Sequence, residues 1–270
     1  MNTTPLLDYH THTVFSTDGY SSIGKMAEAA ASLGISQIAI TDHYDPDYPL
    51  DGWGEEFSFD EYHKQLEKVQ EEYKARISLV KGLEVGIQHG STLRKCSESV
   101  NAYDYDFIIG SFHCAEGFEL SCGGFFDGRS VEEATAAFYR YTYDCLSVYR
   151  DYDVLGHMNV IDRYGGYVPA YDDLMDIISE ILKLIIYDGK GIEINTSSFR
   201  YGMGDHTTPS GEILKRYREL GGEIITVGSD AHSARDVGYG IKWAYEKMKS
   251  VGFRYVTAYC RRKPTFLSIV

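Results

Sequence analysis

The sequence lacks the cysteine patterns that mark disulfide-stabilised domains and thiolate metal sites. Its five cysteines are scattered, are odd in number and include no C-x-x-C pair: Cys96, Cys114, Cys122, Cys145 and Cys260. A disulfide framework or a Cys-based zinc site needs such pairing. We therefore expect free thiols and a reducing compartment.

Long apolar runs and nucleotide-binding loops are missing as well. No segment approaches the roughly 20 apolar residues that a membrane helix needs, and Asp8 interrupts the start of the chain before a secretory apolar core can form. These features predict a cytoplasmic protein that does not associate with membranes. No G-x-G-x-x-G follows the first apolar run, and no G-x-x-x-x-G-K-[ST] occurs anywhere, which argues against Rossmann and P-loop folds.

Positive charge is in short supply. Only 26 Lys and Arg stand against 40 Asp and Glu, so the 270-residue chain has a formal net charge of -14 and a pI near 5.0. An acidic chain is a poor match for extended nucleic acid or an anionic membrane. A small anionic substrate stays compatible, because a local site can oppose the global charge. The sequence does not define an oligomeric state.

Short apolar runs alternate with longer helical patterns along the chain. The expected strands are Pro5–Tyr9, Gln37–Thr41, Ile77–Val85, Asp106–Ser111, Asp153–Gly156, Gly191–Asn195, Glu223–Gly228 and Arg254–Ala258. The expected helices are Ser22–Leu33, Phe59–Ala75, Val131–Tyr149, Asp172–Tyr187, Ser210–Leu220 and Ile241–Val251. Such alternation predicts a mainly parallel sheet. With seven or eight repeats and no linker, we predict one α/β barrel domain over residues 1–270.

Histidines and acidic residues stand where the expected strands end. The motifs are H-x-H at His10 and His12, T-D-H at His43, G-L-E at Glu84, S-F-H at His113, G-H at His157, and S-D-A-H at Asp230 and His232. All strand ends of one kind open on one face of a parallel barrel, and residues i and i+2 point to the same side of a strand. Imidazole and carboxylate ligands without thiolate suit Zn, Fe or Mn. We predict a metal site here, with Glu84 able to bridge two cations.

Three other histidines lie outside this pattern. His63 falls in a charged helical stretch and is expected at the surface, and His89 in a solvated loop. His206 follows Asp205 in a loop and is a candidate for substrate contact.

Together with Asp18, the strand-end motifs resemble those of the polymerase and histidinol phosphatase (PHP) superfamily. The resemblance spans essentially the whole chain and implies a distorted (β/α)7 barrel holding three divalent metal ions. By motif position, one ion would be held by His10, His12, Glu84 and Asp230, a second by Glu84, His113 and His157, and a third by Asp18, His43 and His232. Asp18 stands where some members have histidine.

Two further stretches, GHMNVIDRYG from Gly156 and EINTSSFR from Glu193, resemble the histidinol-phosphatase branch. That resemblance implies hydrolysis of L-histidinol phosphate in histidine biosynthesis. Arg163 and Arg200 lie just beyond strand ends, where guanidinium groups can hold phosphate oxygens. Either could instead pair with a nearby acid such as Asp162 or Asp205, and Arg235 is a weaker candidate for the same role.

We hypothesise that a metal-bridging hydroxide attacks phosphorus in line, and that Asp18, or water near His232, supplies a proton to the leaving group. Three alternatives stay open. Another PHP phosphoesterase would act on nucleotides, nucleic-acid ends or phosphotyrosine. An amidohydrolase-type barrel would usually need a bridging Lys on a middle strand, where this chain has Glu84 in the corresponding role. A non-catalytic PHP module would lack ligands that this chain retains.

Overall fold

The computed structural model describes residues 4–50, 53, 57–122 and 124–269. Seven parallel strands run in the spatial order β1 (Leu7–Asp8), β2 (Gln37–Ile40), β4 (Ser78–Gly86), β5 (Phe107–Ser111), β8 (Val154–Leu155), β9 (Gly191–Asn195) and β10 (Ile225–Gly228), and β3 (His43–Tyr44) adds to β4. Because neighbours in this order follow one another along the chain, each connection is a short crossover of the kind that builds barrels.

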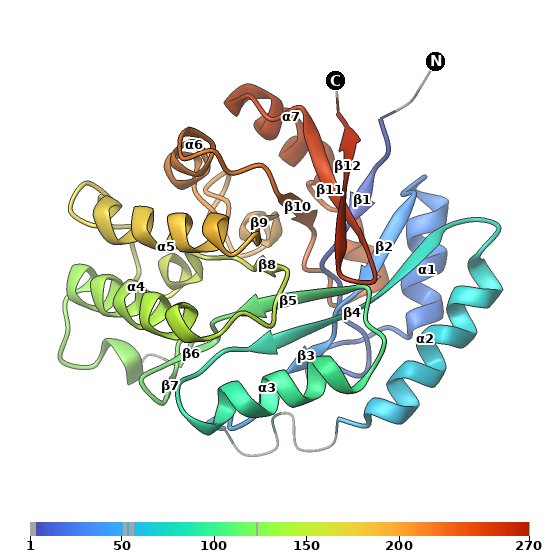
Figure 1. The fold of residues 1–270 in the computed structure, drawn as a ribbon, viewed down its shortest axis with the longest axis horizontal. Helices are drawn as coiled ribbons and strands as arrows, with labels where there is room; N and C mark the ends of the chain where they lie inside the picture. The colour runs from blue at the N-terminus through green and yellow to red at the C-terminus, as the bar shows by residue number, and fades with distance from the viewer. Residues whose placement is uncertain (1–3, 51–52, 54–56, 123, 270) are drawn as a thin grey trace.

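The sheet curls into a nearly closed barrel (Figure 1). The amide of Tyr9 donates to the carbonyl of Val227 at 2.9 Å, and the amide of Asp230 donates to the carbonyl of His10 at 2.8 Å. These bonds tie the residues after the first strand to the last strand and the loop beyond it. The predicted α/β barrel of seven strands is confirmed.

Helices cover the outside of the barrel (Figure 1). They are α1 (Ile23–Ser32), α2 (Phe59–Tyr73), α3 (Ser91–Ala102), α4 (Val131–Val148), α5 (Met175–Tyr187), α6 (Gly211–Glu219) and α7 (Ile241–Val251), with short 3₁₀ turns η1 (Gly124–Phe126), η2 (Val160–Arg163), η3 (Ser197–Phe199) and η4 (Ala234–Asp236). Capping side chains fix where some of these helices begin. In α4, Ser130 and Glu133 form a reciprocal capping box that satisfies two otherwise unpaired amides. No helix in the described part of the chain is long and apolar enough to cross a membrane.

Three sequence expectations need correction. The run Arg254–Ala258 is not a barrel strand: it lies in β11 (Tyr255–Cys260), which pairs antiparallel with β12 (Lys263–Ser268). Helix α3 was not predicted, because its pattern of Ser, Thr and charged residues masks three buried positions. His63 is buried rather than exposed, because its ring stacks on Tyr103 with centroids 4.3 Å apart. A short antiparallel pair, β6 (Cys114–Ala115) and β7 (Phe118–Glu119), also follows β5.

Backbones approach so closely at Gly228 that no side chain fits. A Cβ there would lie 2.3 Å from Glu193 Oε1 and 2.3 Å from the Cβ of His10. We expect Gly228→Ala to lower the free energy of unfolding by about 1–3 kcal/mol, the usual cost of forcing atoms into a packed site. Urea denaturation followed by circular dichroism measures the change.

The matched control is Gly24→Ala in the first turn of α1, where a Cβ would meet nothing within 4 Å. That change should raise stability by roughly 0.5–1 kcal/mol through helix propensity. Equal stability of Gly228→Ala and the parent protein would contradict the close approach.

Candidate metal centre

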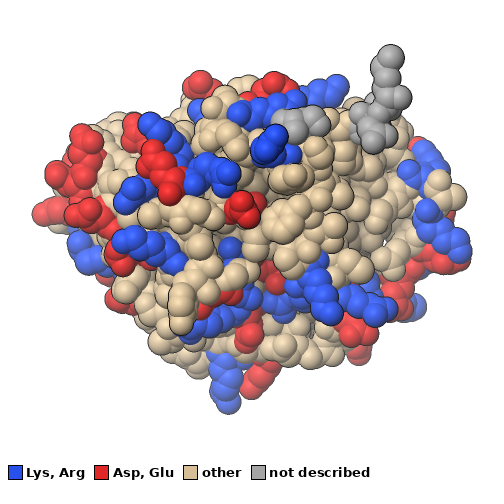
Figure 2. All heavy atoms as spheres, turned by 45° about the horizontal axis from the view of Figure 1, so that its top comes forward, with Lys and Arg blue, Asp and Glu red and all other residues tan. Residues whose placement is uncertain are grey.

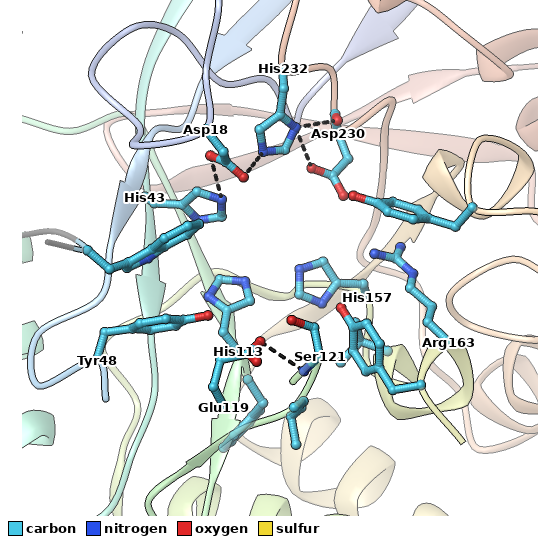
Figure 3. A pocket seen from close by; sticks show the side chains of 16 residues that line it. Asp18, His43, Tyr48, His113, Glu119, Ser121, His157, Arg163, Asp230 and His232 are labelled. Atoms are coloured by element: carbon cyan, nitrogen blue, oxygen red, sulfur yellow. Dashed lines mark hydrogen bonds and ion pairs between the residues drawn. The ribbon is translucent and has the colours of Figure 1, made fainter. Parts of the chain in front are cut away.

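A cavity of about 250 Å³ opens at the carboxyl ends of the barrel strands. Histidines and acids predicted from the strand-end motifs form much of its wall (Figure 3). The lining side chains include Asp18, His43, His113, His157, Arg163, Asp230 and His232, together with Tyr48, Glu119, Tyr164 and Tyr201. His10, His12 and Glu84 lie behind this wall and are fully buried.

The carboxylate of Glu84 stands at the centre of the cluster. Strand β4 carries it between neighbours on both sides, and Glu84 is paired in register with His43 of β3. Its Oε1 accepts a hydrogen bond from Ser111 Oγ at 2.6 Å. The same oxygen lies 3.0 Å from His157 Nε2 and 3.4 Å from His113 Nε2. One half of the carboxylate therefore faces the histidines of β5 and β8.

The other oxygen of Glu84 faces the opposite half of the cluster. Oε2 lies 2.8 Å from His43 Nδ1, 3.2 Å from His10 Nε2 and 3.5 Å from His12 Nε2. The two carboxylate oxygens of Glu84 thus contact two separate groups of imidazoles. This arrangement is the one that a carboxylate bridging two cations requires.

Asp230 completes the inner group from the end of β10. Its Oδ1 lies 3.3 Å from His12 Nε2 and 3.8 Å from His10 Nε2. Asp230 has φ of 55°, a left-handed conformation that is uncommon for a residue with a Cβ. Arg200 Nη2 donates to the carbonyls of Ser229 and Asp230 at 2.8 and 2.7 Å and holds this turn in place.

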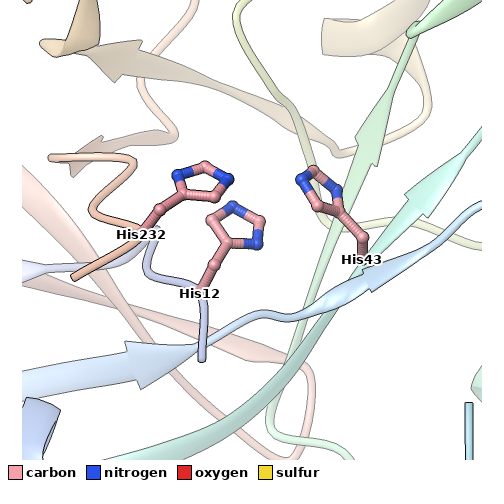
Figure 4. Close-up of side chains that lie close together, drawn as sticks. All are labelled: His12, His43 and His232. Carbon is pink, nitrogen blue, oxygen red and sulfur yellow. The ribbon is translucent and has the colours of Figure 1, made fainter. Parts of the chain in front are cut away.

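An outer group forms around Asp18. Asp18 Oδ2 lies 3.1 Å from His232 Nε2, and Oδ1 lies 3.8 Å from His43 Nε2. The ring of His12 lies close to both the ring of His43 and the ring of His232, with centroids 4.1 and 4.2 Å away (Figure 4). The structure thus brings all nine predicted side chains to one place from loops and strands hundreds of residues apart.

Four overlapping sets of donor atoms lie close enough to share a cation. They are His12, His43 and His232; His10, His12 and Asp230; His10, Glu84 and His157; and His43, Asp45 and His113. Several of these donors are buried and meet oppositely charged atoms of the same cluster without forming a well-aligned hydrogen bond: His10 Nε2, His12 Nε2, His43 Nδ1, His232 Nε2, Glu84 Oε2 and Asp18 Oδ1. Burying polar atoms without well-aligned hydrogen bonds is costly, and a divalent cation satisfies such lone pairs. The residues therefore fit a metal centre.

A second layer fixes which imidazole nitrogen faces the centre. His10 Nδ1 lies 2.7 Å from Glu193 Oε1, and His113 Nδ1 lies 2.7 Å from Asp45 Oδ1. A carboxylate accepts a hydrogen bond from the ring N–H that it contacts, so each Nδ1 carries the hydrogen and each Nε2 keeps its lone pair for a cation. Ser16 Oγ lies 3.1 Å from His12 Nδ1 and donates a hydrogen bond to Asp42 Oδ1. The ring of His12 is therefore held in place as well.

Sequence reasoning missed Asp45 and Glu193. Asp45 lies two residues after His43, the same spacing that identified His10 and His12, and so carried a usable signal. Glu193 lies inside β9 rather than at its end, so the strand-end pattern does not point to it. Gly86 makes room for Asp45, because a Cβ there would lie 1.9 Å from Asp45 Oδ1.

The pKa directions show that the cluster carries an excess of negative charge. Burial lowers the pKa of His10, but the neighbouring Glu193, Glu84 and Asp230 outweigh it and raise that pKa well above 6.5. Burial also opposes protonation of His232, yet Asp18 and Asp230 raise its pKa to about 9. Burial raises the pKa of Glu84, and the surrounding imidazoles reverse this and bring it well below 4.5. Without metal, protons on the imidazoles supply the positive charge that the carboxylates demand.

Arg163 is the predicted substrate residue that lines the cavity. Its Nη2 donates to Ser197 Oγ at 2.6 Å, its guanidinium lies 4.6 Å from the ring centre of Tyr201, and its buried Nε has no partner. It pairs with neither Asp162 nor Asp205.

The other predicted substrate residues lie outside the cavity lining. Arg200 keeps a buried Nη1 without a partner behind the Asp230 turn. His206 lies 2.9 Å from Asp162 Oδ2. Arg235 is largely exposed and pairs with Asp236, and His89 is exposed, as expected.

This parallel barrel, with imidazoles and carboxylates gathered at its mouth, defines the class of metal-binding α/β barrel proteins. Comparison with known proteins gives the family: the PHP domain matches residues 8–197, and the chain belongs to the PHP domain family. The assignment of residues 1–270 to one domain stays a prediction, and residues 1–3 and 270 lie outside the described chain.

Relatives of this chain match it over nearly their whole length. A probable histidinol-phosphatase of Clostridium acetobutylicum is 31% identical over 268 residues, covering 97% of this chain and 96% of that protein. The histidinol-phosphatase of Lactococcus lactis is 30% identical and covers 95% of both chains. The crystal structure of histidinol phosphate phosphatase from that species, in complex with zinc, L-histidinol and phosphate, superposes with a TM-score of 0.88 at 28% identity, over 96% of this chain and 98% of that one.

The second layer generates a direct test. Glu193→Gln keeps the shape of the side chain but removes the charge that holds His10 Nδ1–H. We expect the variant to bind zinc about 10–100-fold more weakly, the usual effect of losing such a partner. Competition with a chromophoric chelator measures this affinity.

The control is Glu223→Gln, an exposed glutamate just before β10 whose nearest ion pair is a 3.6 Å contact with Arg218. Zinc affinity equal to that of the parent protein in both variants would show that Glu193 does not act on the centre.

Proposed function

We propose that this protein is a metal-dependent phosphomonoesterase that hydrolyses L-histidinol phosphate to L-histidinol and phosphate in histidine biosynthesis. The observation that carries the proposal is the opening of the imidazole and carboxylate cluster onto one cavity together with Arg163. A cavity that contains both metal-ligating side chains and a guanidinium is suited to bind a phosphoryl group. The Lactococcus lactis relative, which was crystallised with L-histidinol and phosphate, supports the same substrate.

We further propose three divalent cations, zinc, iron or manganese, in the centre. The inner set is His10, His12, Glu84 and Asp230, the second is Glu84, His113 and His157, and the outer is Asp18, His43 and His232. The two-sided environment of Glu84 and the buried donors without well-aligned hydrogen bonds support these sets. Bound divalent cations polarise phosphoryl oxygens and lower the pKa of water from 15.7 to about 7.

The side chains of this chain have separate tasks in the proposed reaction. Arg163 binds the non-bridging oxygens of the phosphoryl group and offsets their charge. Asp18 moves a proton: burial raises its pKa, but the contact with His232 lowers it below 3.8, so Asp18 is a carboxylate at neutral pH. Either Asp18, once it has taken up a proton, or water near His232 supplies the proton that the leaving alkoxide needs, while His232 fixes the position of the Asp18 carboxylate. Contact between Arg200 and phosphate stays a prediction.

Glu119 gives the cavity a second, negative end. Burial raises the pKa of this carboxyl, but hydrogen bonds from Cys122 and Ser121 outweigh it and lower the pKa, so Glu119 is ionised. Its side chain and that of Tyr48 enter the cavity away from Arg163 (Figure 3). Histidinol phosphate carries an ammonium group on the carbon next to its phosphate-bearing carbon and an imidazole at its far end, and we propose that Glu119 attracts these cationic groups.

Other substrates are less well matched. On the face shown in Figure 2, Lys and Arg are interspersed with Asp and Glu, which supports a small substrate over extended nucleic acid. No Lys lines the cavity among the described residues, which disfavours an amidohydrolase-type centre. All five cysteines are free in the structure, and a cytoplasmic location stays a prediction.

The decisive experiment combines metal analysis with a substrate panel. We expect the purified protein to contain bound metal and to release phosphate from histidinol phosphate faster than from nucleotides, phosphotyrosine or nucleic-acid ends. His12→Ala and Glu84→Ala should lose metal and activity together, because His12 belongs to the proposed inner set and Glu84 to both the inner and the second set. Bound metal with no phosphatase activity on any member of the panel would reject the proposed function.

The two ends of the cavity can be tested as a pair. Arg163→Ala should raise KM at least about tenfold for every phosphomonoester, because a charge-assisted contact is worth about 1.5–3 kcal/mol. Glu119→Gln should raise KM for histidinol phosphate and leave KM unchanged for an ester without a cationic group, such as glycerol phosphate. Steady-state kinetics on both esters separates the effects. Equal losses on both esters in Glu119→Gln would refute the cationic subsite.

A further inference from the structure

A buried polar cluster lies beside the metal centre and shares no residue with it. The carboxylate of Asp162, in η2, is almost completely buried. Its Oδ2 accepts hydrogen bonds from Asn159 Nδ2 at 2.7 Å, from His206 Nε2 at 2.9 Å and from the hydroxyl of Tyr171. These three donors come from different parts of the chain. Their bonds to one oxygen therefore tie those parts to η2.

His206 is the member that comes from a separate segment, the stretch between η3 and α6. That stretch is anchored at its far end, where the amide of Asn195 donates to the carbonyl of Thr208 at 2.8 Å. Asn159 Nδ2 also lies 3.4 Å from the carbonyl of Thr207. The bond to Asp162 therefore adds a side-chain tie between this segment and η2.

The same two segments enclose Arg163. Arg163 follows Asp162 in η2. Its guanidinium is held by Ser197 Oγ, at the start of η3, and by the ring of Tyr201, just after η3 on the way to His206. Asp162 and Arg163 are thus neighbours in sequence. Asp162 bonds to His206 outside the cavity lining, and Arg163 contacts Ser197 and Tyr201 where it lines the cavity.

We propose that Asp162 and His206 form a clasp that positions Arg163, so that His206 sets the phosphate affinity of the cavity without contacting the ligand. The proposal rests on the part of the proposed function that assigns phosphate binding to Arg163. Both members of the clasp are positioning residues. The clasp replaces the direct substrate contact predicted for His206 from the sequence.

The physical reason is preorganisation. A free arginine side chain loses up to about 2 kcal/mol of conformational entropy when it is fixed in one geometry. The clasp holds the Tyr201 and Ser197 supports against Arg163 before the ligand arrives, so that less of this cost falls on binding. Loss of the clasp should then weaken phosphate binding and leave the metal ligands in place.

The test uses the metal-loaded protein and inorganic phosphate as the probe, with calorimetry for Kd and elemental analysis for bound metal. The variants are His206→Ala, His206→Gln, Arg163→Ala and the double variant His206→Ala with Arg163→Ala. Gln can place an amide N–H close to the position of Nε2, so it should rescue the clasp. The matched control is His89→Ala, because His89 is an exposed loop histidine away from this cluster.

We expect His206→Ala to weaken phosphate binding roughly tenfold, a coupling of about 1.4 kcal/mol, with metal content unchanged. His206→Gln should stay within about threefold of the parent protein, a difference of roughly 0.7 kcal/mol. In the Arg163→Ala background, removal of His206 should cost little more, because a residue that acts through Arg163 has nothing left to position.

Phosphate affinity unchanged in His206→Ala, loss of metal in that variant, or the same weakening with and without Arg163 would each overturn the clasp. Failure of the proposed function looks different. If Arg163→Ala itself leaves phosphate affinity unchanged, the assignment of phosphate binding to Arg163 is wrong and the clasp falls with it. If phosphate binding follows the predicted pattern but histidinol phosphate is not hydrolysed, the clasp stands and the substrate assignment fails.

Discussion

The burial of the Glu84 carboxylate among five imidazoles is the constraint on which the rest of the site depends. An isolated charge in such a position would be expelled or neutralised, so the structure must supply positive charge within contact distance. It does so through His10, His43 and His113, whose neighbouring acids raise their pKa values and whose charges lower that of Glu84. Protons on these rings stabilise the fold without metal, and divalent cations can take their place. Metal binding and proton release are therefore two sides of one equilibrium.

The barrel topology makes this concentration of charge possible. Parallel strands deliver their carboxyl ends to one face, and loops there can carry polar side chains without disturbing the apolar core below. Close backbone approaches bring the layers together: Gly228 admits Glu193 beside His10, and Gly86 admits Asp45 beside His113. The second-layer carboxylates are thus as much a product of small residues at strand ends as of the acids themselves.

Motif spacing predicted the barrel and eight of the nine clustered side chains because both follow from short-range rules, whereas Asp18 was predicted only from the family resemblance. Residues i and i+2 share a side, and strand ends share a face. What the sequence could not supply were pairings set by tertiary packing. The burial of His63 depends on Tyr103, some 40 residues further along the chain, and β11 is as apolar as a barrel strand although it pairs with β12 in a hairpin. His206 belongs to the same group: nothing in its surroundings in sequence indicates a bond to Asp162.

The second-layer acids also change the electrostatic account of an acidic phosphatase. Counting only Asp18, Glu84 and Asp230 against three divalent cations leaves a strongly positive centre. Asp45 and Glu193 lie in contact with the histidines and bring the centre much closer to neutrality. A phosphate dianion is then held less by net charge than by directed contacts. Arg163 is the only Lys or Arg among the described side chains that line the cavity, and its buried Nε lacks a partner. If Arg163 binds phosphate as proposed, the affinity of this site for phosphate depends on how firmly one guanidinium is held.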